Sequence, residues 1–141
     1  MKAFFDTSVL VAVFRGDHEH HERSLRVFAS STTKDTACSL HTLAELFAVL
    51  TALPVKPPIS PEHVMLFVDE IRARLTPISL DSQDYYQTLG AAAERGLFDG
   101  RIYDALLLRC ARKCHAQTIY TWNLRHFKAI APDLATRLRM P

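Results

Sequence analysis

The chain has 141 residues, 48% of them hydrophobic, which suits one domain, residues 1–141, with a substantial buried core. The 17 Lys and Arg against 15 Asp and Glu leave a net charge of +2, too small to indicate nucleic-acid binding by itself. The odd count of three Cys, with no CxxC pair, argues against a disulfide framework and for a reducing, cytoplasmic location. Asp6 interrupts the N-terminal apolar run, so no signal peptide is predicted, and no apolar stretch is long enough for a membrane span.

The first third of the chain predicts two strands and two helices. Residues 2–5 (KAFF) form a short apolar run typical of a buried strand, and Asp6 ends it. Residues 8–14 predict a short helix. Residues 18–30 predict a second helix, and residues 35–40 (DTACSL) predict a second strand.

The middle of the chain predicts two helices separated by a stiff loop. Residues 41–53 carry Leu and Phe side chains spaced i, i+3, i+4, i+7, which is typical of an amphipathic helix. Four prolines in residues 54–61 predict a rigid connection, and Pro61 suits the first turn of a helix over residues 61–75. Residues 76–80 (TPISL) predict a third strand.

The last third continues the alternation. Residues 82–96 predict a helix that Asp81 is placed to cap, and residues 102–115 predict another helix. Residues 117–121 predict a fourth strand, and residues 124–130 predict a last short helix. Short strands alternating with longer helices predict an α/β fold in which a short parallel sheet of about four strands has helices on both faces.

Polar residues stand where ligands bind in such folds, outside the carboxyl ends of the strands. Asp6 follows the first strand, and Asn123 follows the fourth. Glu45 lies near the start of the helix after the second strand, and Asp104 lies in the first turn of a strongly apolar helix, which predicts burial of its carboxylate. These four side chains are predicted to converge on one rim of the sheet.

Simpler explanations stand beside this hypothesis. Asp6 is suited to cap the following helix, and Thr42 with Glu45 matches a capping box. Asp99 precedes Gly100 and is typical of a turn residue. If the acids do converge, their mutual repulsion requires a cation, and an oxygen-only site suits Mg²⁺ or Mn²⁺. Phosphodiester hydrolysis is the chemistry that commonly uses such a cluster.

Four stretches together resemble the PIN-domain family, and within it the VapC-type toxins of bacterial and archaeal toxin–antitoxin systems. They are FFDTSVLVA, SLHTLAELFAVLTALP, GRIYDALLLRCA and IYTWNLRHF, and the resemblance runs nearly from end to end. It implies a metal-dependent endoribonuclease, usually a homodimer, that is held inactive by a cognate antitoxin protein.

The resemblance also implies roles for individual residues. Asp6, Glu45 and Asp104 match the acidic metal ligands and catalytic acids, and Asn123 matches a fourth position that in many relatives is Asp. Asp6 and Asp104 are expected to hold Mg²⁺ or Mn²⁺, while Glu45 orients or deprotonates the attacking water. Lower-ranked candidates for positioning water, phosphate or RNA are Thr7, Ser8, Asp99, Thr121, Arg101, Arg125 and His126.

The antitoxin groove is expected on the apolar residues of the segment 8–14 and the helix 61–75. The principal alternative is a catalytically weakened PIN-like module that binds RNA or a partner, which the Asn at position 123 supports. An Asp-nucleophile phosphatase is disfavoured because such enzymes need a second Asp two residues after the first, and position 8 is Ser. The His-rich segment 18–23 does not match the HExxH zinc motif and is interpreted as an exposed helix face.

Overall fold

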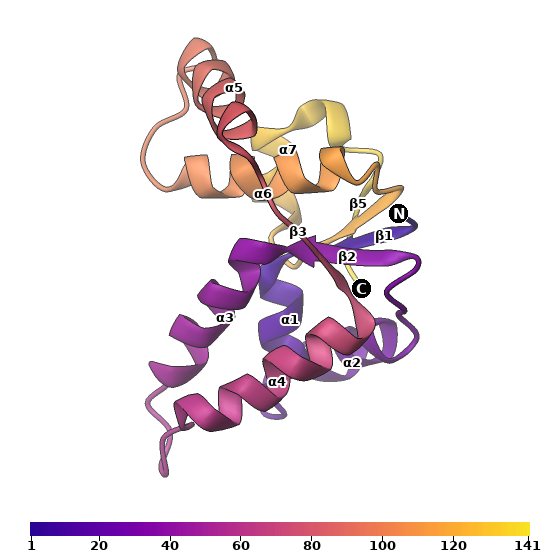
Figure 1. Ribbon diagram of the computed structural model, residues 1–141, viewed down its shortest axis with the longest axis vertical. Helices are drawn as coiled ribbons and strands as arrows, with labels where there is room; N and C mark the ends of the chain where they lie inside the picture. Colours follow the sequence, from indigo (N-terminus) through magenta and orange to yellow (C-terminus); the bar gives the residue numbers. More distant parts are fainter.

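Five short parallel strands form the central sheet of this computed structural model, which describes all residues 1–141 (Figure 1). The strands are β1 (Ala3–Phe5), β2 (Thr36–Ser39), β3 (Thr76–Ile78), β4 (Thr118–Tyr120) and β5 (Leu138–Arg139). They lie in the order β3-β2-β1-β4-β5. In the central strand, Phe5 is in register with Cys38 of β2 and Tyr120 of β4. The residues that follow β1, β2 and β4 therefore emerge along the same edge of the sheet.

Helices cover both faces of this sheet (Figure 1). They are α1 (Thr7–Val13), α2 (His21–Ala29), α3 (Leu40–Thr51), α4 (Pro61–Arg74), α5 (Ser82–Glu94), α6 (Arg101–Lys113) and α7 (Leu124–Ile130), followed by the 3₁₀ turn η1 (Pro132–Leu134). In the view of Figure 1, α1 to α4 lie below the sheet and α5 to α7 lie above it. None of the helices is both long enough and apolar enough to cross a membrane.

Two hydrophobic clusters, one on each face of the sheet, hold the helices against the strands. Successive strand residues point to opposite faces, so Phe5 enters the cluster packed with α1, α3 and α4, while Phe4 enters the cluster packed with α6 and α7. Both side chains are almost completely buried. A strand that is apolar on both faces is expected in a parallel sheet covered by helices on each side.

The predicted α/β fold is confirmed, with one strand more than expected. β5 spans only Leu138 and Arg139, and it joins the sheet through backbone bonds, among them that of the Thr121 N–H to the Arg139 carbonyl at 3.0 Å. A two-residue strand carries no periodic pattern of its own, so only pairing with β4 defines it. The expected cap of α5 is also confirmed, because the Asp81 carboxylate accepts the backbone N–H of Asp84 at 2.8 Å.

Candidate active site at the carboxyl edge of the sheet

Asp6 is the innermost acid at this edge. Its backbone N–H donates to the Tyr120 carbonyl at 3.0 Å, which continues the pairing of β1 with β4 by one residue. Asp6 occupies the N-cap position of α1, but its side chain accepts no capping bond. The residue is only 4% exposed, so the carboxylate lies inside the protein. Asp6 therefore has a role other than capping the helix.

Two hydroxyl groups hold the Asp6 carboxylate. Ser8 Oγ donates to Asp6 Oδ2 at 2.7 Å, and Thr121 Oγ1 donates to the same oxygen at 2.9 Å. Each hydroxyl in turn accepts a backbone N–H that follows β4, from Trp122 to Ser8 at 3.1 Å and from Asn123 to Thr121 at 3.0 Å. Because an ionised carboxylate can only accept hydrogen bonds, both hydroxyl groups donate their protons to Asp6. No side-chain donor contacts Asp6 Oδ1, which leaves that oxygen available to a ligand.

No cationic side chain neutralises the Asp6 carboxylate. Burial raises the pKa of Asp6 above its ordinary value of 3.8, the hydrogen bonds from Ser8 and Thr121 oppose this rise, and the negative charge of Asp104 adds to it. No Lys, Arg or His forms an ion pair with this carboxylate. A buried, ionised carboxylate beside a second acid is stabilised by a positive ion.

Glu45 reaches the edge from α3, and the capping-box interpretation of this residue is wrong. The helix begins at Leu40, before Thr42, and its N-cap is Ser39, whose hydroxyl accepts the backbone N–H of His41 at 3.1 Å. Glu45 Oε1 instead accepts the hydroxyl of Thr7 at 3.3 Å. Thr7 Oγ1 lies 3.0 Å from Thr42 Oγ1, so a buried pair of hydroxyls connects the residue after Asp6 with Glu45.

Asp104 faces Asp6 from the first turn of α6. The expected burial on most sides is confirmed only in part, because the side chain is 33% exposed. Its Oδ2 lies 2.8 Å from Nε2 of His126, which α7 carries. The apolar residues after Asp104 do enter the core, but Asp104 stands at the open start of the helix, where solvent and His126 reach it.

The flanking candidates lie around these acids. Asp99 has a φ of 55° and adopts a left-handed turn before α6, which confirms the turn interpretation. Its carboxylate binds the Arg101 guanidinium at 3.1 Å, and Arg101 also lies over the ring of Phe98. Asn123 is exposed and joins the Asp6 network through its backbone, while its side-chain amide makes no hydrogen bond. Arg125 is exposed and makes no hydrogen bond or ion pair.

The oxygen donors at this edge fit a hard divalent cation, but the acids do not form a closed cage. No three His, Cys, Asp or Glu side chains lie close enough together to hold a metal ion. Asp104 is engaged by His126, and Glu45 is engaged by Thr7. Mg²⁺ commonly binds through only one or two carboxylates and keeps several waters, so it does not require a third acidic side chain at this edge.

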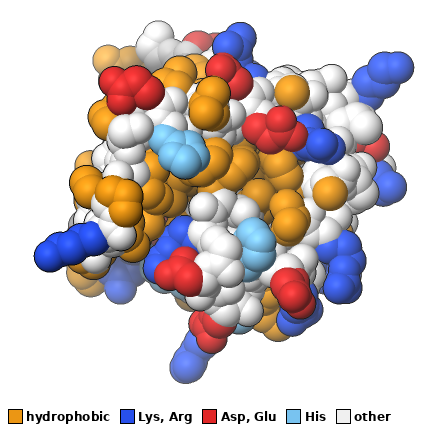
Figure 2. Space-filling model, turned by 90° about the horizontal axis from the view of Figure 1, so that it is seen from below, with side chains coloured by type: hydrophobic (Ala, Val, Ile, Leu, Met, Phe, Trp, Pro, Cys, Tyr) orange, Lys and Arg blue, Asp and Glu red, His pale blue; other side chains and the backbone are white.

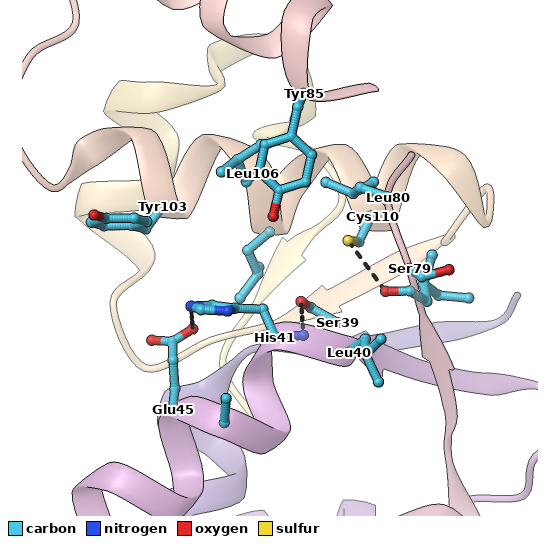
Figure 3. A pocket seen from close by; sticks show the side chains of 13 residues that line it. Ser39, Leu40, His41, Glu45, Ser79, Leu80, Tyr85, Tyr103, Leu106 and Cys110 are labelled. Atoms are coloured by element: carbon cyan, nitrogen blue, oxygen red, sulfur yellow. Dashed lines mark hydrogen bonds and ion pairs between the residues drawn. The ribbon is translucent and has the colours of Figure 1, made fainter. Parts of the chain in front are cut away.

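A cavity of about 390 Å³ opens beside Glu45, and it contains residues that the sequence did not single out (Figure 3). It lies between α3, α5, α6 and the end of β3, and its lining includes His41, Tyr85, Tyr103 and Cys110. His41 stands one turn before Glu45 on α3, with Nε2 3.9 Å from Glu45 Oε1. The adjacency of Tyr103 to Asp104 was a signal available in the sequence, whereas the approach of Tyr85 depends on how α5 packs against α6.

The fold and the acids at its edge define a class of protein. The chain belongs to the PIN domain family, whose model matches residues 3–131, which confirms the family predicted from the sequence. Among characterised proteins, it is 32% identical over 120 residues to Ribonuclease VapC40 of Mycobacterium tuberculosis, an alignment that covers 85% of each chain.

Solved structures share the fold. Mycobacterium tuberculosis VapC20, described as a sarcin-ricin loop cleaving toxin, aligns with a TM-score of 0.72 at 17% identity, covering 91% of this chain and 95% of that chain. VapBC2 of Rickettsia felis, solved bound to a promoter DNA fragment, aligns with a TM-score of 0.68 at 22% identity, covering 100% of this chain and 99% of that chain.

Proposed function

We propose that this protein is a Mg²⁺- or Mn²⁺-dependent endoribonuclease and the toxin of a VapBC-type toxin–antitoxin pair. One observation carries the proposal: the Asp6 carboxylate is buried beside Asp104 with no Lys, Arg or His paired to it, in a chain 32% identical to Ribonuclease VapC40. A carboxylate in this position is costly unless a positive ion binds it, and hydrolysis of a phosphodiester is a reaction that uses such an ion.

Asp6 and Asp104 are the residues that hold the ion in this proposal. The hydroxyls of Ser8 and Thr121 fix Asp6 Oδ2 and leave Oδ1 for the ion. The bond of Asp104 Oδ2 to His126 orients the second carboxylate. When bound, Mg²⁺ or Mn²⁺ neutralises charge on the phosphate and lowers the pKa of a coordinated water.

In this proposal, Glu45 orients and deprotonates the attacking water. Thr7 holds Oε1, and no hydrogen-bond donor contacts Oε2, so that oxygen is free to accept a proton from water. The water oxygen forms a bond to phosphorus as the bond from phosphorus to the ribose oxygen breaks; Glu45 takes the water proton, and the leaving ribose oxygen takes a proton from solvent. Arg125, which is exposed and has no hydrogen-bond or ion-pair partner, is proposed to bind a phosphate of the RNA backbone.

Variants of the two acids test this proposal. Asp6→Ala and Asp104→Ala are each expected to reduce metal-stimulated RNA cleavage at least a hundredfold and to relieve growth inhibition, while circular dichroism confirms that they fold. The control is Asp69→Asn, which removes an exposed carboxylate of α4 that makes no ion pair. Full cleavage by a folded Asp6→Ala variant contradicts the proposal.

The antitoxin is proposed to bind the half of the molecule below the sheet. Viewed from below, hydrophobic side chains gather across the centre of this surface (Figure 2). Phe14, at the end of α1, stacks on Phe67 of α4 with ring centroids 4.6 Å apart, and Val11 is only partly buried beside them. The similarity to the VapBC2 complex and the apolar character of these residues support an antitoxin partner here.

Replacement of one aromatic residue tests this surface. Phe67→Asp is expected to abolish co-purification with the product of a short neighbouring gene, because it places a charge in the apolar contact. The control is Leu89→Asp, which adds the same charge to an exposed apolar position on α5. Equal capture of the antitoxin by both variants contradicts the assignment. A homodimer is part of the same proposal, and light scattering is expected to give twice the mass of one chain.

One observation favours a second function, that of a catalytically weakened module that binds RNA or a partner. The acids form no group of three, and the fourth position is an exposed Asn whose amide has no partner. If the protein binds RNA but cleaves none with Mg²⁺ or Mn²⁺, while Asn123→Asp restores cleavage, this second function replaces the first.

A further inference from the structure

We propose that the cavity between α3 and α6, the α3–α6 cavity, accepts one unpaired nucleobase of the RNA, next to the bond that is cut. This inference rests on the proposed function and deepens it. The cavity has a volume of about 390 Å³, which lies within the range of small-molecule sites. Glu45 belongs both to its lining and to the row of acids. A base in the cavity is therefore attached to a nucleotide whose phosphate lies at the carboxyl edge.

Two rings at the mouth of the cavity have the geometry for stacking. The rings of His41 and Tyr103 are nearly parallel, with an interplanar angle of 16° and centroids 6.5 Å apart. Figure 3 shows both rings edge-on, with Tyr103 reaching from α6 and His41 from α3. Because the two planes are nearly parallel, a flat group can stack against the face of either ring. Tyr103 is 61% exposed and is free to adjust.

The chemistry of the lining selects a flat, uncharged group. Nine of the 13 lining residues are hydrophobic, and none is Lys or Arg, so the cavity offers no binding site for a phosphate. Leu107 and Cys110 are buried and form part of an apolar wall. The Tyr85 hydroxyl points into the cavity from α5 and makes no hydrogen bond, so it can contact a base edge (Figure 3). Apolar walls, nearly parallel rings and unpaired hydroxyl groups match a nucleobase.

Recognition of this kind is how proteins select single-stranded RNA. Unpaired bases turn outward, stack on aromatic side chains and expose their edges to hydrogen-bonding groups. The α3–α6 cavity therefore links sequence preference to cleavage, because the base that fills it sets which phosphate lies beside Asp6 and Asp104.

Abasic substitution combined with Tyr103 variants tests the inference. An RNA oligonucleotide cut by the wild type at one site is synthesised as a series, each member lacking a single base. In the wild type, one abasic position beside the cut is expected to lower kcat/KM about tenfold, as expected for the loss of one stacked base. Tyr103→Ala is expected to lose a similar factor on the intact RNA and to be insensitive to that abasic position, whereas Tyr103→Phe keeps the wild-type pattern. The control is Tyr86→Ala, which removes a ring that is 76% exposed on α5 outside the cavity.

The outcomes separate this inference from the proposed function. A wild type that cleaves the RNA equally well whichever base is missing overturns the cavity assignment and leaves the nuclease intact. A wild type that cleaves no RNA overturns the nuclease, and fluorescence anisotropy with the same abasic series then decides the cavity through binding alone. If Tyr103→Ala converts a dimer to a monomer in light scattering without changing the abasic pattern, a second copy of the chain covers the cavity, and the inference is wrong.

Discussion

Asp6→Asn offers the sharpest test of the electrostatic argument, because it removes one charge and almost no volume. The folded protein binds the Asp6 proton more tightly than the unfolded chain does, since burial raises the pKa above 3.8. This group therefore favours folding below pH 3.8, and its contribution is lost as the pH rises through the folded-state pKa. At neutral pH without metal, Asp6→Asn is expected to be more stable than the wild type.

The size of the change follows from chain length. At about 2.1 cal/mol/K per residue, 141 residues have an unfolding entropy of about 0.3 kcal/mol/K, so about 1 kcal/mol shifts the Tm by about 3 °C. A metal ion at a hundred times its Kd stabilises the folded state by about 2.7 kcal/mol, or roughly 9 °C.

Thermal unfolding measures both effects. With chelator, the Tm of Asp6→Asn is expected to exceed that of the wild type at neutral pH, and the difference is expected to vanish as the pH falls towards 3.8. With Mn²⁺, the wild type is expected to gain several degrees, as is the control Asp69→Asn, whereas Asp6→Asn gains little. The reasoning is refuted if Asp6→Asn is the less stable protein in chelator and still gains as much from Mn²⁺ as the control does.

Further predictions concern the fourth rim position and the stability of the fold. Asn123→Asp is expected to tighten Mn²⁺ binding in a calorimetric titration, because it adds a carboxylate to the rim; unchanged affinity places this side chain outside the metal site. Leu46→Ala is expected to cost about 2–5 kcal/mol in urea unfolding, since this fully buried side chain leaves a cavity in the core. Asp81→Ala is expected to lower the Tm by about 3 °C through loss of the α5 cap, worth about 1 kcal/mol. The Lys113 ammonium lies 2.8 Å from the Asp84 carboxylate and is the main cause of the lowered pKa of Asp84. The wild type is therefore expected to be more stable than Asp84→Asn at neutral pH, and this difference is expected to shrink below pH 3.8. A stability difference that does not change with pH contradicts the ion pair as its cause.

Local patterns were enough to predict the elements that position the site. Short apolar runs correctly marked four of the five strands, and the spacing of Leu and Phe in residues 41–53 correctly marked α3. Alternation of strands and helices then predicted a parallel sheet, and parallel strands bring their carboxyl ends to one edge. The approach of Asp104 to Asp6 follows from this topology, although 98 residues separate them in the chain.

Partners and burial were decided by the tertiary structure. The sequence favoured Asp104 as the buried acid, but Asp6 is the more deeply buried of the two. The reason is that Asp6 follows the central strand β1, whereas Asp104 lies at the solvent-exposed start of α6. Thr42 and Glu45 match a capping box, yet Ser39 caps the helix and frees Glu45 to bind Thr7.

The sequence by itself determined which chemistry is available: three acids, an amide and a set of hydroxyls at strand ends and in early helix turns, in an order shared with the PIN domain family. Only the tertiary structure decided how they are arranged, including the contact of His126 with Asp104 and the nearly parallel rings of His41 and Tyr103. The physical reason is that residue order and periodicity are local properties, whereas desolvation, charge interaction and ring stacking depend on neighbours that come together only when α3, α6 and α7 pack around the sheet.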